Sequence, residues 1–138
     1  WRLNGYISRE IKQGNIGGRL AEKILIPAPP RLHTELLLIC GMGNAAKFSL
    51  EQMQRFAYLT IESVDKLLID DFSLELPGSN RVNLPLEDVA EAAARGFFEY
   101  LSRDAKKLNK MKTCLLTVPE QAKEAVAGLK NFRAKLKN

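Results

Sequence analysis

An uninterrupted apolar run from Leu36 to Gly41, extended by Met42, constrains the fold of this chain more than any other feature of its sequence. The run has the length of a β-strand and falls far short of the ~20 residues that a membrane-spanning helix needs. A strand without alternating polar positions is typically buried on both faces, as in sheets that carry helices on both sides. The run therefore favours an α/β protein.

Helical and strand-like patterns alternate along the rest of the chain. Apolar residues at helical spacing predict helices from Leu3 to Ile11, from Ser49 to Val64, from Asn83 to near Arg103 and from Pro119 to the end of the chain. Strands are predicted at Glu22–Pro27, Glu35–Cys40, Leu67–Leu76 and Lys112–Val118. Helical crossovers between strands predict an α/β fold with three α/β/α layers: a mostly parallel mixed sheet with helices on both faces, in which the first two strands can pair directly. No repeat or linker divides the 138 residues, so a single domain over residues 1–138 is predicted.

Local signals place the helix boundaries. Gly14 stands where a left-handed residue would end the first helix, and Ser49 with Gln52 makes a capping box for the second. Asn83 is predicted to cap the third helix, with Pro85 in the first turn, where a missing N–H costs nothing. The last helix is predicted to turn one apolar stripe inward, made of Ala122, Ala125, Leu129, Phe132 and Leu136.

The net charge of +5 is concentrated near the C-terminus. Residues 105–138 hold nine Lys or Arg against two Glu, and residues 1–104 hold twelve against fourteen acids. Lys123, Lys130 and Lys137 are seven apart, so they share one side of the last helix with Arg133; we call these four residues the basic ridge. A solvated helix face is the favoured interpretation, because no stacking aromatics or DNA-binding motif accompany the ridge; the alternative is weak, non-specific binding of nucleic acid or another anion.

Gly41-Met42-Gly43 follows the apolar strand, at the position where open α/β sheets place ligand-binding loops. Glycines there let backbone N–H groups approach a phosphate. The third glycine of a dinucleotide motif is absent, however, and Ala46 precedes Lys47 where a phosphate loop has glycine. A tight turn is therefore favoured over a phosphate cradle.

The sequence contains no recognisable catalytic or metal-binding constellation, and no cofactor is predicted. His33 is the only histidine, and it lies among prolines in a predicted surface loop. Neither Cys, Asp nor Glu stands at ligand spacing beside it. Cys40 and Cys114 each lie within an apolar run, which is typical of reduced thiols and predicts a cytoplasmic location.

The glycine and apolar pattern of the N-terminal half resembles the N-terminal domain of the leucine (cytosol) aminopeptidase family. The resemblance is carried by Leu3-Asn4-Gly5-Tyr6-Ile7-Ser8, Ile11, Gly14, Asn15, Gly17-Gly18, the strand Glu22–Pro27, the run from Leu36 to Gly43 and Phe48-Ser49-Leu50-Glu51. It implies a macro-domain-like α/β/α fold, which in the family precedes a separate catalytic domain with two divalent metals. Family members have one or more strands before the first helix, and these have no counterpart here. The Asn-Thr-Asp-Ala-Glu-Gly run of the family's catalytic domain has no counterpart in this sequence either.

The resemblance implies a non-catalytic accessory or interaction domain that acts in assembly or ligand contact. Its partner would be a protein, either a second copy of the chain or another subunit, and the chain is not expected to bind a membrane. Three alternatives stay open: a module that binds ADP-ribose or a related nucleotide near Gly41, Gly43 and Asn44, a truncated part of an active metallo-aminopeptidase, and a weak nucleic-acid binder that uses the last helix.

Overall fold

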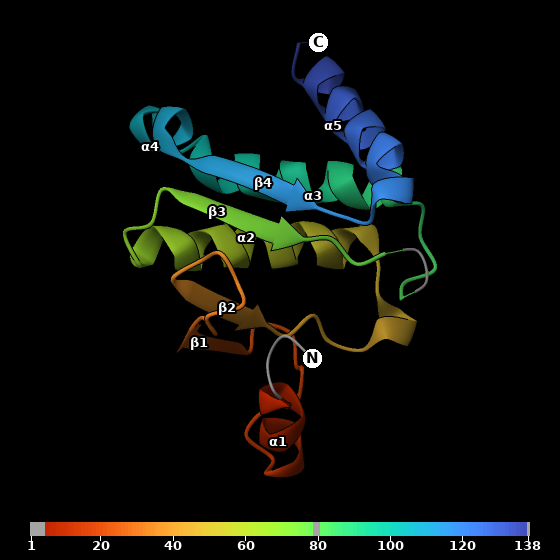
Figure 1. The fold of residues 1–138 in the computed structure, drawn as a ribbon. Coiled ribbons are helices and arrows are strands. Elements are labelled where there is room, and N and C mark those ends of the chain that lie inside the picture. Colours follow the sequence, from red (N-terminus) through yellow and green to blue (C-terminus); the bar gives the residue numbers. More distant parts are fainter. Residues whose placement is uncertain (1–4, 79–80, 138) are drawn as a thin grey trace. The chain divides into compact units, whose positions relative to one another are not determined.

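A computed structural model of the chain describes residues 5–78 and 81–137 (Figure 1). The backbone divides into two compact units, Trp1–Asn44 and Ala45–Asn138. Leu3, at the start of the first predicted helix, lies outside the described residues. A single domain over residues 1–138 stays a prediction.

The first unit contains α1 (Tyr6–Lys12) and an antiparallel pair of strands, β1 (Lys23–Pro27) and β2 (Leu36–Cys40). Gly14 has a φ of 77°, so the left-handed residue predicted after the first helix is confirmed. The two strands pair directly, as predicted, with Lys23 opposite Cys40. Burial of β2 on both faces was wrong, because Leu36 is exposed and the rest of the strand is half-buried. A strand is buried on both faces only where other layers pack on both, and α1, which has seven residues and none of them buried, supplies little such cover.

The second unit begins with η1 (Ala45–Lys47) and the long helix α2 (Leu50–Lys66). The predicted capping box is confirmed: the Gln52 N–H donates to Ser49 Oγ at 3.2 Å, and the Ser49 N–H donates to Gln52 Oε1 at 3.1 Å. Leu50 is exposed, and the apolar side of the helix is buried from the next turn on, through Met53, Phe56, Ala57, Thr60, Ile61 and Val64. Helix α2 therefore forms where its amphipathic pattern places it.

Helix α3 (Leu86–Leu101) has the buried apolar face that its helical spacing predicts, which includes Leu86, Val89, Ala90, Ala93, Phe97 and Leu101. Its start was predicted wrongly: Pro85 itself is the N-cap residue, with φ −58° and ψ 134°, and no side chain caps the helix. Proline cannot donate an N–H and holds φ near the helical value, so the helix begins directly after it without a cap from Asn83.

Strands β3 (Asp71–Glu75) and β4 (Lys112–Leu116) pair in parallel, with Asp71 opposite Lys112. The predicted third strand began too early, because Leu68 takes a left-handed φ of 59° in the turn after α2. Helix α4 (Ala105–Lys110), which was not predicted, is capped by Asp104, whose side chain accepts from two backbone N–H groups. The chain then passes through η2 (Pro119–Gln121), which confirms that Pro119 begins a helical segment.

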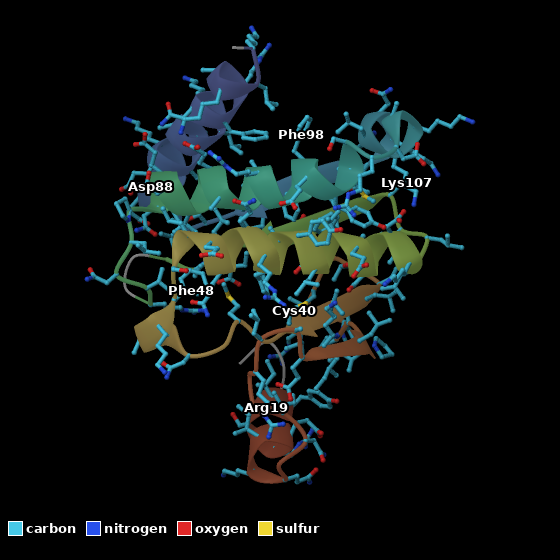
Figure 2. All side chains as sticks on the ribbon, turned by 180° about the vertical axis from the view of Figure 1, so that it is seen from behind. Arg19, Cys40, Phe48, Asp88, Phe98 and Lys107 are labelled. Carbon is cyan, nitrogen blue, oxygen red and sulfur yellow. The ribbon has the colours of Figure 1, made fainter. Side chains whose placement is uncertain are left out.

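Helices α2 and α3 cover one face of the β3–β4 pair, as the opposite views of Figures 1 and 2 show. The Phe72 ring of β3 meets the Phe97 ring of α3 edge to face at 5.7 Å. On the other face Ser73 and Cys114 are exposed. The α/β class is thus confirmed, and the parallel arrangement holds for β3–β4, whereas β1–β2 is antiparallel. Helices on both faces of one sheet stay a prediction.

Helix α5 (Ala122–Leu136) packs against α3 through Ala125, Gly128 and Phe132, whose ring lies 5.8 Å from that of Phe98. In Figure 2 the Phe98 side chain points from α3 toward α5. The predicted inward stripe is therefore partly wrong: Ala122, Leu129 and Leu136 are exposed. Among the described residues, no helix is both long and apolar enough to cross a membrane.

Candidate functional site

The predicted ligand loop after β2 is packed tightly against its own unit. A Cβ on Gly41 would lie 2.0 Å from the backbone oxygen of Arg19, so only glycine fits there. The Gly41 N–H donates to the Glu22 carbonyl at 2.8 Å, and the Gly43 N–H donates to the Gly18 carbonyl at 2.9 Å. The loop brings Gly41, Gly43 and the exposed Asn44 together, but both glycine N–H groups are already engaged. This geometry is that of a tight turn.

A second glycine turn in the same unit already holds an anion from the chain itself. The Glu22 carboxylate accepts from the Gly17 N–H at 3.0 Å and from the Gly18 N–H at 2.5 Å. Hydrogen bonds from the Gly17 and Gly18 backbone lower the pKa of Glu22, outweighing the opposing effect of desolvation. Sequence reasoning missed this arrangement, although two adjacent glycines followed by an acid four residues later are a usable signal.

The basic ridge is the most exposed of the predicted sites. All four of its side chains are exposed, three on α5 and that of Lys137 directly after it, and none of them has an ion-pair partner among the described residues. Lys135 on the same helix is different, because its Nζ lies 2.5 Å from Glu91 Oε1 and ties α5 to α3. The structure thus separates one lysine that holds the helix from four cations that face solvent.

The apolar stripe of the last helix was predicted to be buried, but the apolar residues beside the ridge are exposed. Val126, Leu129 and Leu136 are 48%, 39% and 49% exposed, and they lie on the same side of α5 as the ridge. Exposed apolar residues in a row along a helix are uncommon on a monomer's surface and mark contact surfaces. The apolar spacing of the last helix was visible in the sequence, but Leu129 and Leu136 were assigned to the core instead of to a contact surface.

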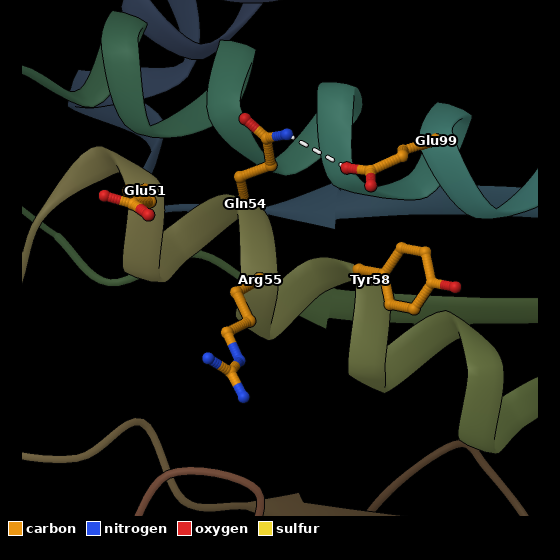
Figure 3. A pocket seen from close by; sticks show the side chains of 5 residues that line it. All are labelled: Glu51, Gln54, Arg55, Tyr58 and Glu99. Carbon is orange, nitrogen blue, oxygen red and sulfur yellow. Dashed lines mark hydrogen bonds between the residues drawn. The ribbon is translucent and has the colours of Figure 1, made fainter.

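A shallow hollow of about 280 Å³ lies on the surface of α2 and α3 (Figure 3). It is lined by Glu51, Gln54, Arg55, Tyr58 and Glu99. The Gln54 side chain donates to Glu99 at 3.0 Å, which joins the two helices across it. Opposite charges mix within this open hollow, so it has no clear preference for an anion or a cation. Within residues 5–78 and 81–137, no three His, Cys, Asp or Glu side chains gather as metal ligands would.

Asp65 anchors a polar cluster where α2, α3 and α4 meet. Its Oδ2 accepts from the Tyr100 hydroxyl at 2.6 Å and from Lys107 Nζ at 2.5 Å. The hydrogen bond from Lys107 is the main cause that lowers the pKa of Asp65, and the hydrogen bond to Asp65 raises the pKa of Tyr100 to about 12. Lys107, labelled in Figure 2, attaches the short helix α4 to the rest of the unit, so the cluster is structural.

Two further acids, at the end of α2 and directly before β3, are also paired with lysines. Glu62 lies 3.2 Å from Lys66, and Asp70 lies 2.5 Å from Lys110. His33 is exposed.

Comparison with known proteins identifies a family and a relative from it. The model of the cytosol aminopeptidase family's N-terminal domain matches residues 2–110. A probable cytosol aminopeptidase from Thermosynechococcus vestitus is 28% identical over 105 residues, which make up 76% of this chain and 20% of that protein. The match therefore spans about a fifth of the relative's length, and β4 and α5 lie beyond the range of the family model.

Proposed function

Since the chain belongs to the cytosol aminopeptidase family, through the N-terminal domain of that family, we propose that it is a non-catalytic accessory domain that acts in assembly. The observation that carries this proposal is the identity of the matched part: it is the N-terminal domain, and it corresponds to 20% of the relative. The exposed row of apolar and basic side chains on α5 supports a role in protein contact. We place the protein in the cytoplasm, in keeping with the relative's description and with the two cysteines, neither of which forms a disulfide.

Assembly is favoured over nucleotide contact because of the geometry of the glycine loop. A nucleotide near Gly41 and Gly43 would need their N–H groups, and both donate to carbonyls of the first unit. Taking either donor would leave a carbonyl without its partner, which costs free energy. Calorimetric titration with ADP-ribose tests this: no heat at millimolar ligand is expected, and saturable heat that disappears in an Asn44→Ala variant would favour the nucleotide-binding alternative.

The direct test of the non-catalytic role is a peptidase assay. The purified chain is incubated with leucine p-nitroanilide and added Mn²⁺ or Zn²⁺, and the full-length Thermosynechococcus relative is assayed as the positive control. We expect no metal-dependent release of p-nitroaniline above the buffer rate. Turnover that rises with chain concentration and is lost with a chelator would instead identify the chain as part of an active peptidase.

A further inference from the structure

The exposed side of α5 has the residue order of a helix-pairing seam. Ala122, Val126, Leu129, Arg133 and Leu136 follow one another at alternating spacings of four and three. This is the a and d spacing of a heptad repeat, and all five residues are exposed. The seam runs for about 21 Å along the helix.

The lysines of the basic ridge occupy one defined flank of this seam. Lys123, Lys130 and Lys137 each directly follow a d position, so they are the e residues of the same repeat. The opposite flank contains Ala125 and Phe132, which pack against α3. The seam is therefore bordered by positive charge on its open side and by the α3 contact on the other.

Helix α5 is held in place independently of any partner. Its inner side is fixed by Gly128 against the α3 backbone, by Asn131 bonded to Glu87 at 2.6 Å and by Lys135 bonded to Glu91. A partner would thus meet a preformed helix, and this lowers the conformational entropy lost on binding.

The charges beside the seam indicate whether a second copy of α5 or a different helix can bind there. Two copies of α5 paired antiparallel would place e-position lysines opposite each other, and Arg133 would lie within the shared apolar seam. A partner with Asp or Glu beside its apolar seam would instead pair with Lys123, Lys130 and Lys137 and could reach Arg133. An acidic amphipathic helix fits this surface, whereas a second copy of α5 does not.

We infer that the exposed seam of α5 docks an acidic amphipathic helix of a partner protein, which packs on Val126, Leu129 and Leu136 beside the three e-position lysines. The inference gives a surface and a partner chemistry to the proposed assembly role and rests on it. It concerns a part of the chain beyond the matched residues 2–110. Two heptads are too few for a self-standing coiled coil, so the partner helix would pack on a helix that α3 already holds in place.

The test uses a fluorescein-labelled peptide of about four heptads with Leu at a and d and Glu at e and g. Its acidic flanks limit self-association at neutral pH. Fluorescence anisotropy with the full chain should show saturable binding, and the same peptide with Lys at e and g should bind at least about tenfold more weakly. Equal binding of the acidic and basic peptides would overturn the inference.

Two variants locate the binding on α5. Val126→Glu places an acid in the seam and should weaken binding by about tenfold or more, while Glu at 126 and Lys130 form a favourable i, i+4 pair that keeps the helix. Lys123→Gln, Lys130→Gln and Lys137→Gln together should weaken binding by about fivefold to tenfold. The matched control replaces exposed Lys12, Lys47 and Lys106 by Gln and should leave binding unchanged.

Further measurements separate loss of binding from loss of fold, other ligands from a helix, and this inference from the proposed function. Circular dichroism melts should be the same for all four proteins, which separates loss of binding from loss of fold. If the acidic peptide fails while duplex DNA or phosphatidylserine vesicles bind through the ridge, the helix partner is wrong. Peptidase activity of the chain would overturn the accessory role and leave the peptide result standing, so the two failures are distinguishable.

Discussion

Helix α5 approaches the backbone of α3 closely at Gly128, and this contact gives a sharp stability prediction. A Cβ at this position would lie 2.1 Å from the Glu87 carbonyl oxygen and 3.0 Å from the Glu91 backbone nitrogen. The first distance is about 1.4 Å shorter than an ordinary contact of ~3.5 Å. Both atoms belong to the α3 backbone and cannot rotate away, so Gly128→Ala must push the two helices apart.

The magnitude follows from two opposing effects. Overpacking against a rigid backbone costs about 3 kcal/mol, at the upper end of the usual range. Alanine in place of glycine within a helix returns about 1 kcal/mol. We therefore expect a net loss of about 2 kcal/mol in the free energy of unfolding, which corresponds to roughly 10 °C in Tm for a unit of this size.

Urea unfolding followed by far-ultraviolet circular dichroism measures this loss. Gly17→Ala is the control, because a Cβ there would lie 3.6 Å from the nearest atom, in the flexible Arg19 side chain. Gly96→Ala should behave like Gly128→Ala, since its Cβ would lie 2.1 Å from the Gln54 carbonyl oxygen of α2. A Gly128→Ala protein as stable as the unmodified chain would refute the close approach of the two helices.

Four further outcomes are expected. Because folding lowers the pKa of Asp65, its carboxylate stabilises the fold above the pKa of the unfolded chain, and this stability is lost as the pH falls through the folded pKa. The urea midpoint of the unmodified chain should therefore fall more between about pH 5 and pH 2 than that of Asp65→Asn. The same variant should bring the Tyr100 pKa down from about 12 toward 10.0, read from absorbance at 295 nm. The buried Thr60 hydroxyl has no hydrogen-bond partner among the described residues, so Thr60→Val should raise the free energy of unfolding by about 1 kcal/mol. An unchanged urea midpoint would mean that the hydroxyl makes a hydrogen bond in the folded protein. Leu68 is 89% exposed with a left-handed φ of 59°, so Leu68→Gly should leave the chain as stable or more stable by up to about 1 kcal/mol in the same assay.

The elements that the sequence predicted well are those with a local physical cause. The capping box at Ser49 and the apolar stripes of α2 and α3 depend on residues a few positions apart, and the structure has them as expected. Helix α4 was missed because its six residues show little amphipathic pattern, and its attachment depends on Lys107 reaching Asp65. No local pattern reports a contact between residues so far apart in the sequence.

The glycine loop shows a different limit. Sequence position placed Gly41 and Gly43 correctly after a strand, and a tight turn was the favoured interpretation. The reason for the glycines is the approach of the Gly18 and Arg19 backbone, which a sequence pattern cannot distinguish from the approach of a phosphate. Spacing alone thus left the two interpretations open.

The basic ridge and the exposed seam beside it lead to opposite expectations for salt. If the ridge acts alone on duplex DNA, about four phosphate contacts give a slope near −4 in the logarithm of the binding constant against that of salt, and binding vanishes at ~150 mM. Val126 and Leu129 add apolar contact, which salt at this level does not screen, so an acidic helix should lose only the small part that comes from exposed ion pairs. A gel shift with two unrelated duplexes and the peptide titration, both at low and at ~150 mM salt, compare the two directly. Retention of the peptide with release of both duplexes identifies a helix-docking surface, whereas tight retention of one duplex would identify a sequence-specific nucleic-acid binder.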